Sequence, residues 1–400
     1  MSAFPNQESS HSAPLLSLTP AQFARLQPHT YVYAHLSPSS DHPRPSTRIN
    51  GRSESQFRAA TVNTGSLTHA NGSAVVRIGE TTAVCGVRGE ILSTDDIPAW
   101  SISNTSSGST AKSPREESTE DDDDTEIQVF NLLVPNLSLS TGCSPAIAAS
   151  SAPSSLAQSL SHQLLSLLHT SRLIRSRDLR IWSSPNRTPI LSQEHSDVTM
   201  EDAPASTEPL DAPEIKAFWT LYIDVLIISL AGNPFDAAWA AVVAALRDTR
   251  LPKAWWDIDN EMILCSDCVS ESTTLQLRGM PISSSFAVFE ADPVNDWRKI
   301  IVDCQHVESN SEDSMKDDNK TESPKKIKRW ILADPDAFEE SLCQERACIV
   351  VDKSSGASDP VKIIRMEKSG GFYIGKNELK ELVNSAAGRW EEWRGLLDGV

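Results

Sequence analysis

Residues 218–231 (FWTLYIDVLIISLA) form a nearly continuous apolar run of strand-forming residues, and this run limits the possible folds most strongly. Such a run is typical of a strand that is covered on both faces. Residues 236–246 (DAAWAAVVAAL) follow at once and are apolar around most of a helical circumference, which predicts a buried helix. The pair predicts a sheet with helices packed against it.

The rest of the chain adds further strands and helices. Residues 73–91 alternate and are rich in Val and Ile around Gly79-Glu80, which predicts a hairpin, and residues 127–139 predict another strand. Apolar residues at helical spacing predict a helix over 154–174. Additional strands are expected at 274–277, 285–290, 299–303, 330–333, 347–352 and 361–367, with helices at 19–26 and 376–397. The fold class is therefore mixed α and β, α/β (α+β).

Three polar segments carry most of the net charge of −18. Residues 115–126 and 194–214 each contribute −7 and residues 305–326 contribute −2, so the remainder is close to neutral. Their composition cannot bury enough apolar surface to offset the entropy of ordering. We expect disordered insertions at 101–126, 184–214 and 305–326, and this division gives an N-terminal extension (1–46) and two halves (47–183 and 215–400).

Nothing in the sequence suggests insertion into a membrane or secretion. No run reaches the roughly 18 apolar residues that a spanning helix needs, and the N-terminus lacks a basic start followed by an apolar stretch. The seven scattered cysteines favour reduced thiols over a disulfide framework. We expect a soluble protein of a reducing compartment.

An ordered series of short motifs resembles the RNase PH fold (ribosomal protein S5 domain 2-like) as it occurs in the ring subunits of the eukaryotic exosome. The series consists of Arg48-Ile-Asn-Gly-Arg52, Phe57-Arg58, Gly65-Ser-Leu, Ala70-Asn-Gly-Ser-Ala74, Gly79-Glu-Thr, Val87-Arg-Gly-Glu90, Leu221-Tyr-Ile-Asp224, residues 281–289 and residues 332–340. The resemblance covers residues 20–397 with the three insertions as departures. It implies a fold of two βα-repeat halves.

The resemblance also implies where a phosphate-dependent exoribonuclease would hold its anion. Active members of the family use a Gly-Thr-Arg step before a long helix, and this sequence has Asn233, Pro234 and Phe235 there. Pro234 has no N–H to donate, Phe235 has no charge, and Asp236 adds a negative one. We therefore expect no phosphorolysis and consider these residues a vestigial phosphate loop.

Asp334 and Glu340 match the spacing of two carboxylates that active members use to hold a metal or assist proton transfer. A structural alternative exists for both acids. Asp334-Pro335 would then be a turn that closes a strand, and Glu339-Glu340 would belong to the start of a helix. We expect vestigial acids, no catalytic residue, no metal and no cofactor.

Several basic and cysteine-containing segments have two interpretations. Cys265 and Cys268 have the spacing of half a zinc site, but they lack a second pair, and ordinary thiols are the simpler interpretation.

Residues 325–329 (KKIKR) are a candidate nuclear import signal. Five of the ten tryptophans are expected in the core or at subunit interfaces: Trp239, Trp255, Trp256, Trp390 and Trp393. Candidates for RNA contact, or for salt bridges and helix-dipole compensation instead, are Arg52, Arg58, Arg77, Arg88, Arg172, Arg175, Arg177 and Arg180.

The resemblance implies a non-catalytic structural subunit in a hetero-hexameric ring of RNase PH-like proteins. S1 and KH cap proteins would cover that ring, RNA would thread its channel, and the ring would act in rRNA processing and RNA degradation in the nucleus, nucleolus and cytoplasm. An active phosphate-dependent 3′-to-5′ exoribonuclease is the alternative. A weaker one is an RNA adaptor whose acidic insertions recruit partners.

Overall fold

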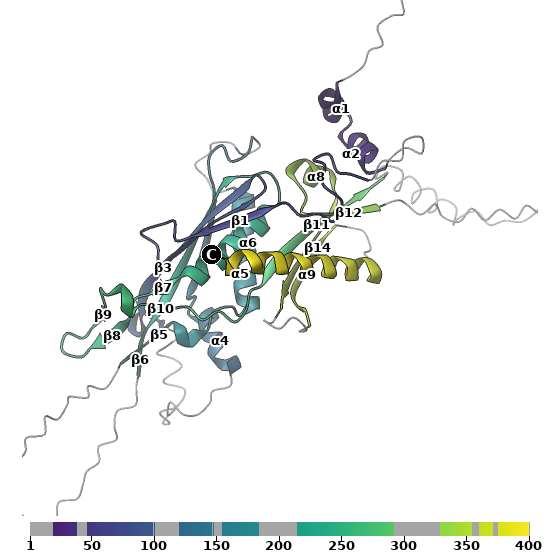
Figure 1. Cartoon of the computed structure of the whole chain (residues 1–400). Helices are drawn as coiled ribbons and strands as arrows, with labels where there is room; N and C mark the ends of the chain where they lie inside the picture. The colour runs from purple at the N-terminus through teal and green to yellow at the C-terminus, as the bar shows by residue number, and fades with distance from the viewer. Residues whose placement is uncertain are drawn as a thin grey trace, which may run out of the picture.

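The computed structural model places mixed sheets and helices as the fold class predicts (Figure 1). The structure describes residues 19–37, 46–98, 100, 120–145, 147, 154–183, 214–291, 329–353, 360–370 and 375–399. Most of the three expected insertions, together with the strand expected at 299–303, lies outside these residues. No helix of the described part is long and apolar enough to cross a bilayer.

The first sheet has six strands in the order β1-β2-β3-β6-β4, with β5 also paired to β6. Only β4 runs parallel to its neighbour β6, and the other pairs are antiparallel. The predicted hairpin is confirmed as β2 and β3, which turn at Gly79 with φ of 58°. The strands are β1 (Ala60–Thr64), β2 (Gly72–Ile78), β3 (Thr81–Ser93), β4 (Leu133–Leu139), β5 (Arg180–Ser183) and β6 (Glu214–Ser229).

The second sheet is antiparallel and has the order β12-β11-β13-β14. Its strands are β11 (Ile282–Glu290), β12 (Arg329–Ala333), β13 (Glu345–Asp352) and β14 (Lys362–Ser369). Two small two-stranded sheets lie beside the first sheet, with strands β7 (Arg250–Leu251), β8 (Ala254–Asp257), β9 (Met262–Cys265) and β10 (Thr273–Thr274). Because β6 belongs to the first sheet, the predicted division at 184–214 does not separate the two sheets.

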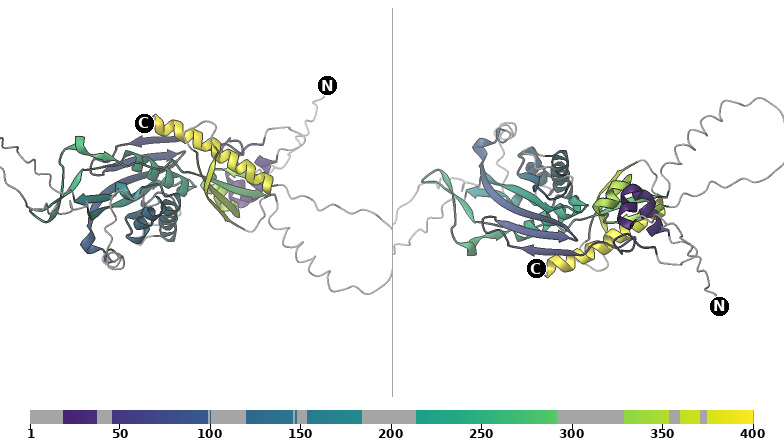
Figure 2. Two further views of the ribbon diagram at one scale, coloured as in Figure 1. Left: turned by 90° about the horizontal axis from the view of Figure 1, so that it is seen from below. Right: turned by 90° about the horizontal axis from the view of Figure 1, so that it is seen from above.

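Three long helices join the sheets into one core. Helix α6 (Pro234–Asp248) packs on β2, β3 and β11, and its residues 236–246 are all buried, as predicted. Helix α9 (Lys376–Asp398) runs along both sheets and contacts β1, β11 and β13 (Figure 2). Helix α5 (Ser155–Ser171) covers β4. Short 3₁₀ helices are η1 (Thr94–Asp96), η2 (Ser176–Asp178) and η3 (Val269–Glu271).

The N-terminal extension packs on the second sheet. The predicted helix is confirmed as α1 (Pro20–Leu26), capped by Thr19 and begun by Pro20, and a second helix α2 (Pro28–Leu36) follows. Val32 and Leu36 join a small separate core with Phe289 and other apolar residues of β11 and β12. Helix α8 (Ala337–Leu342) lies next to α2 and β11.

Three details of the sequence predictions are wrong. Residues 127–129 belong to helix α4 (Glu120–Val129) and not to a strand, so the expected insertion 101–126 also ends in a helix. Strand β10 stops at Thr274 instead of continuing to residue 277. Strand β6 is buried on both faces only over residues 217–221, because Leu226 and Ile228 face outward from the first sheet with exposed fractions of 41% and 49%.

Candidate functional site

The candidate site lies at the turn between β6 and α6, where the sequence places the vestigial phosphate loop. Gly232 has φ of 93°, and Asn233 has φ of 48° and caps α6 without accepting a side-chain hydrogen bond from the helix backbone. A Cβ on Gly232 would collide with the backbone of Asp336 and Ala337. The turn is therefore fitted closely against the start of α8, and Pro234 begins α6.

The side-chain amide of Asn233 joins two buried carboxylates. Its Nδ2 donates to Asp236 Oδ2 at 2.7 Å and to Asp334 Oδ1 at 2.8 Å. Asp236 also accepts hydrogen bonds at 2.9 Å from the backbone N–H and the hydroxyl of Ser285. Burial raises the pKa of Asp236, and the hydrogen bond from Asn233 opposes this only in part. Asp236, whose negative charge would repel an anion, is thus held in the protein interior by these hydrogen bonds.

Asp334 closes strand β12 and is 1% exposed, in a left-handed conformation with φ of 49°. Its carboxylate accepts Arg58 Nε at 2.8 Å, Arg58 Nη2 at 2.7 Å and the Arg58 backbone N–H at 3.0 Å. Burial alone would raise the pKa of Asp334, but the bonds from Arg58 and Asn233 outweigh it and lower the pKa. Asp334 has the geometry of the structural alternative, a turn that closes a strand.

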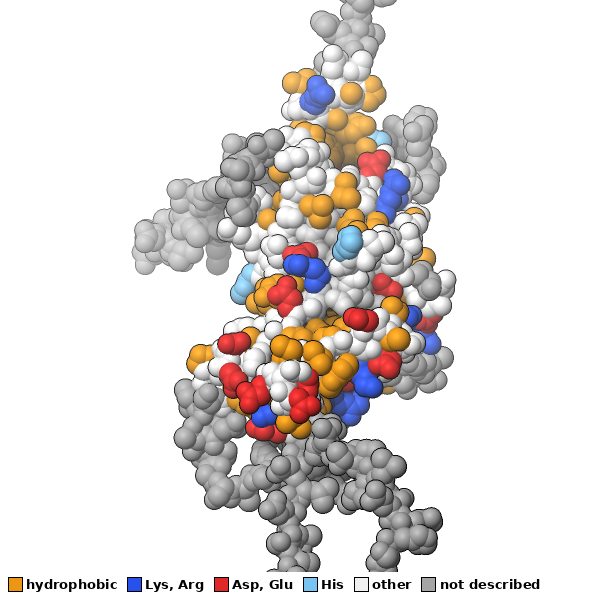
Figure 3. All heavy atoms as spheres, turned by 90° about the vertical axis from the view of Figure 1, so that its left-hand side faces the viewer, with side chains coloured by type: hydrophobic (Ala, Val, Ile, Leu, Met, Phe, Trp, Pro, Cys, Tyr) orange, Lys and Arg blue, Asp and Glu red, His pale blue; other side chains and the backbone are white. Residues whose placement is uncertain are grey.

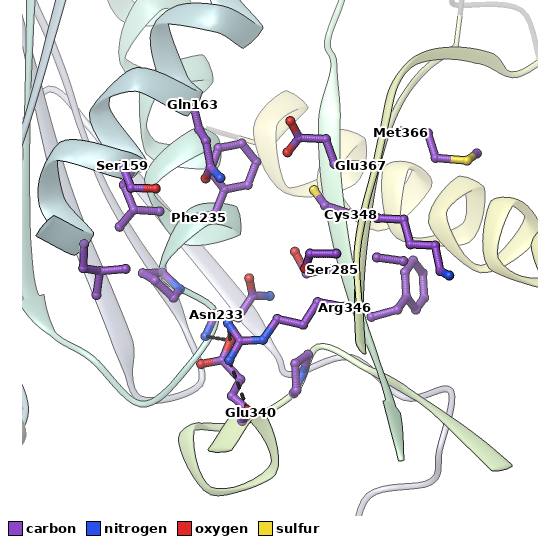
Figure 4. Close-up of a pocket in the computed structure, with 18 residues that line it drawn as sticks. Ser159, Gln163, Asn233, Phe235, Ser285, Glu340, Arg346, Cys348, Met366 and Glu367 are labelled. Carbon is purple, nitrogen blue, oxygen red and sulfur yellow. Dashed lines mark hydrogen bonds and ion pairs between the residues drawn. The ribbon is translucent and has the colours of Figure 1, made fainter. Parts of the chain in front are cut away.

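Glu340 occupies the position where an anion would meet the N-terminus of α6 (Figure 4). Its Oε1 accepts the backbone N–H of Asn233 at 3.0 Å, and Arg346 Nη1 lies 3.9 Å from the same oxygen. Burial raises the pKa of Glu340, and Arg346 reduces that shift. A helix N-terminus favours negative charge, so the carboxylate of the chain itself takes the place of a ligand.

A cleft of about 690 Å³ opens in front of this turn, between α5, the start of α6 and the second sheet. Figure 4 shows Arg346 of β13 extending toward Glu340, with Ser285 on β11 and Cys348 on β13, two neighbouring strands of the second sheet. Burial strongly raises the pKa of Cys348, so this thiol is protonated at neutral pH. Glu340 lines the cleft and buried Asp334 does not, so the two predicted acids do not form a pair facing one substrate.

A second ionic network fixes the segment behind the site. Arg48 is 2% exposed, and both its Nε and Nη2 donate to the carboxylate of Glu339. Arg52 donates to the carbonyl of Asp334, and burial together with Arg48 lowers the pKa of Arg52 to about 10. The predicted RNA contacts Arg52 and Arg58 are therefore engaged with their own chain. The sequence places Glu339 at the start of a helix but does not indicate its pairing with Arg48, 291 positions away, and it gives no sign that Arg346 lies near Glu340.

The remaining candidate arginines do not share one surface. Arg77 and Arg88 are exposed on the first sheet, where Arg77 donates to Gly79 O at 2.7 Å and Arg88 lies 3.5 Å from Asp224. Beyond α5, Arg180 binds Glu126 at 2.8 Å with 11% of its side chain exposed. Arg172 and Arg177 are exposed, and Arg175 lies in a different cleft.

The other candidate segments are partly described. Cys265 and Cys268 are exposed, and no group of three or more His, Cys, Asp and Glu suited to a metal occurs among the described residues. Trp239, Trp390 and Trp393 are in the core, whereas Trp255 on β8 is 38% exposed. Figure 3, which views the end of the molecule at the left of Figure 1, shows acidic, basic and apolar side chains mixed there. Residues 325–328 of the candidate import signal lie outside the described residues.

Comparison with known proteins relates this geometry to a family. A model of the 3′ exoribonuclease family, domain 1 (RNase PH), matches residues 56–252. The exosome complex component rrp43 of Schizosaccharomyces pombe is 31% identical over 285 residues, which cover 70% of this chain and 80% of that protein. The chain belongs to the RNase PH family. The family expected from the motifs is confirmed, and the motifs also resemble those of ribosomal RNA-processing protein forty-three in particular, a likeness that the match to rrp43 bears out.

More distant relatives agree with this assignment to the RNase PH family. The putative exosome complex exonuclease RRP42 of Dictyostelium discoideum is 24% identical over 259 residues, covering 59% of this chain and 69% of that protein. A solved structure described as the Archaeoglobus fulgidus exosome with RNA bound to the active site matches with a TM-score of 0.52 at 18% identity. The match covers 92% of this chain and 96% of that one. It confirms the RNase PH fold.

Proposed function

We propose that this chain is a non-catalytic structural subunit of the exosome core ring. In that role it supports 3′-to-5′ processing and degradation of RNA, including rRNA maturation and mRNA turnover. The likeness to rrp43, which carries the name of an exosome component, supports the assignment to the ring. The geometry of the β6–α6 turn supports the absence of catalysis.

One observation carries the proposal. The backbone N–H of Asn233, the donor nearest to the start of α6, is already bonded to Glu340. An incoming phosphate would have to displace that carboxylate, and Pro234 has no N–H and Phe235 no charge to offer in return. Losing a single strong donor to a developing anion costs on the order of 10² to 10³ in rate. Asp334 cannot compensate because both of its oxygens are held by Arg58 and Asn233.

The partners follow from the same proposal. The chain would lie in a hetero-hexameric ring with other RNase PH-like subunits, under S1 and KH cap proteins, with RNA in the channel. We propose the nucleus, its nucleolus and the cytoplasm as its locations. Its contribution would be a wall and interfaces, since interfaces of this kind rest on apolar anchors and strand edges.

Two measurements test the proposal. The tagged endogenous chain should co-purify with several RNase PH-like proteins in near-equal amounts, whereas a monomer without partners would contradict the structural role. The purified chain and its complexes should release no nucleoside diphosphates from single-stranded RNA when orthophosphate is added. Phosphate-dependent release that disappears in the Glu340→Gln variant would establish the enzymatic alternative instead.

A further inference from the structure

A second cleft lies at the opposite end of α6 from the candidate site. Its volume is about 810 Å³, and it is built from segments far apart in the chain. Arg175 follows α5, Arg247 ends α6, Lys353 follows β13 and Arg394 belongs to the last turns of α9. None of the family motifs in the sequence marks this cleft.

Positive charge dominates the lining of the cleft. Five cations, Arg175, Arg247, Arg278, Lys353 and Arg394, surround it, and the acids are Asp352 and Asp398. The lining therefore has three positive charges in excess, within a chain whose net charge is −18. Four of the five cations are arginines, whose planar guanidinium groups match the oxygens of a phosphate.

The two acids of the lining, Asp352 and Asp398, form contacts with neighbouring residues of the cleft. Asp398 lies 3.1 Å from Arg247 and 3.5 Å from Arg394, so it bridges α6 and the end of α9. Asp352 Oδ1 accepts the backbone N–H groups of Met280 and Lys353, each at 3.0 Å. Asp398 thus holds Arg247 and Arg394 together and Asp352 positions the backbone of residues 280 and 353, while the Lys353 ammonium lies 3.0 Å from Glu391.

The backbone of residues 278–280 brings Arg278 into the cluster. Its N–H donates to Leu173 O at 2.9 Å, which places Arg278 beside the segment that carries Arg175. Gly279 has φ of 148°, and a Cβ at this position would collide with the carboxylate of Asp352. Arg175 Nε is buried and has no hydrogen-bond partner among the residues that the structure describes. The cleft therefore holds a buried donor that an anionic ligand would satisfy.

We propose that this cleft binds the phosphodiester backbone of single-stranded RNA through charge, without reading its sequence. An acidic protein segment is the other chemistry that five cations would attract, but the lining does not suit it. Of its large apolar members, Leu275, Met280 and Trp390 are only 7%, 8% and 3% exposed and Leu277 is partly buried, so the cleft offers little apolar surface for the anchors that protein interfaces need.

The same burial argues against sequence recognition. Trp390 is the aromatic residue of the lining, and its Nε1 donates to Met280 O at 2.7 Å within the core. It offers no face on which a base would stack. Binding should therefore depend on phosphate contacts, and its affinity should fall steeply as salt concentration rises.

The choice of RNA rests on the proposed function, but the experiment separates the two. Fluorescence anisotropy with a labelled oligouridylate of about 12 nucleotides measures RNA affinity of the full chain at two salt concentrations. We expect the double variant Arg278→Ala/Arg394→Ala to bind at least tenfold more weakly and with a salt dependence reduced by about two phosphate contacts.

The double variant Lys362→Ala/Lys380→Ala is the matched control. It removes the same charge from two exposed positions outside the cleft, on β14 and on the first turns of α9. Its RNA affinity should stay within about twofold of the unmodified chain. Equal losses of RNA affinity in both double variants would overturn the proposal that the cleft binds RNA. The absence of RNA binding by the unmodified chain would overturn it as well.

Two further outcomes are decisive. If a polyglutamate peptide bound more tightly than the RNA and lost its binding in the cleft variant, the ligand would be an acidic protein and the proposal would be wrong. Co-purification of ring subunits is read separately in both variants. If the unmodified chain assembles with ring subunits but does not bind RNA, only the proposal that the cleft binds RNA is contradicted. If it binds RNA through the cleft without assembling, only the proposed function is contradicted.

Discussion

Arg58 donates two parallel hydrogen bonds to the carboxylate of Asp334, from Nε to Oδ2 at 2.8 Å and from Nη2 to Oδ1 at 2.7 Å. The two residues are 276 positions apart, and Asn233 completes the coordination of the carboxylate. The ion pair joins the entry to β1, the β6–α6 turn and the end of β12. Asp334, for which the sequence allows either a vestigial acid or a structural turn, anchors three segments of the fold to one another.

Removing the guanidinium group of Arg58 should leave the buried carboxylate of Asp334 without its charged partner. We expect Arg58→Met to lower the free energy of unfolding by about 3–5 kcal/mol, because Asp334 would then remain desolvated and unpaired. Arg88→Met is the matched control, since Arg88 is 54% exposed beside Asp224 and should cost less than about 1 kcal/mol. Urea unfolding measures both. A double variant with Asp334→Asn should lose less than the two single losses combined.

The stability that Asp334 supplies should depend on pH in a definite direction. Its pKa in the folded state is lowered from the ordinary value of 3.8. The contribution is therefore present above the unfolded-state pKa and is lost as pH falls through the folded-state pKa. The deficit of Asp334→Asn relative to the unmodified chain should be large at pH of about 7 and 5 and should shrink below about 3.8. A deficit that is constant with pH would contradict the ion pair.

Glu340 should show the opposite dependence. Burial raises its pKa above the ordinary value of 4.5, so its contribution is present below the unfolded-state pKa and is lost as pH rises through the folded-state value. Glu340→Gln keeps an acceptor for Asn233 N–H but does not titrate. Relative to the unmodified chain, the variant should gain stability as pH rises from about 4.5, measured by urea unfolding at each pH. A gain on lowering the pH would show that Arg346 outweighs burial.

The sequence predicts elements whose pattern is local and misses those decided by distant contacts. The hairpin at Gly79 and the buried helix α6 follow from alternation and from an apolar circumference. Residues 127–129 resemble a strand in the sequence because a short apolar run has the same pattern in a helical turn and in a strand. The sequence analysis missed helix α2 because its apolar side chains pack mainly on residues of β11, β12 and the end of α8, which lie more than 240 positions away in the sequence.

The candidate site shows the same limit. The sequence places Asn233, Pro234 and Phe235 directly before a buried helix, and the structure brings Asn233 into hydrogen bonds with Asp334 and Glu340. The spacing could not indicate that Asp334 is buried against Arg58, or that Glu340 lines the cleft and Asp334 does not. Burial and ion pairing of such residues depend on side chains brought together by the whole fold.

The small core beneath α2 should contribute measurably to stability. Leu36 is 1% exposed between α2 and the second sheet, and Leu26 on the neighbouring helix is 67% exposed. Leu36→Ala should cost about 2–5 kcal/mol through lost burial and a cavity, whereas Leu26→Ala should change little. Thermal and urea unfolding of both variants would check this, and equal effects would show that α2 does not pack as described.

The turn between β6 and α6 should accept no side chain at Gly232. Alanine there meets two penalties, a φ of 93° that L-residues avoid and a collision of its Cβ with the backbone of Asp336 and Ala337. We expect Gly232→Ala to cost about 2–4 kcal/mol in urea unfolding and to loosen the contact between Asn233 and Glu340.

Gly395 provides the matched control for this substitution. It lies within α9, and a Cβ there would have nothing within 4 Å, so Gly395→Ala should raise the free energy of unfolding by about 0.5–1 kcal/mol through helix propensity. Opposite signs for the same chemical change would show that the position of the glycine, and not the added methyl group, decides the outcome. If Gly232→Ala were neutral, the start of α8 would have to move away from the turn, and Glu340 could then no longer be held on the N-terminus of α6.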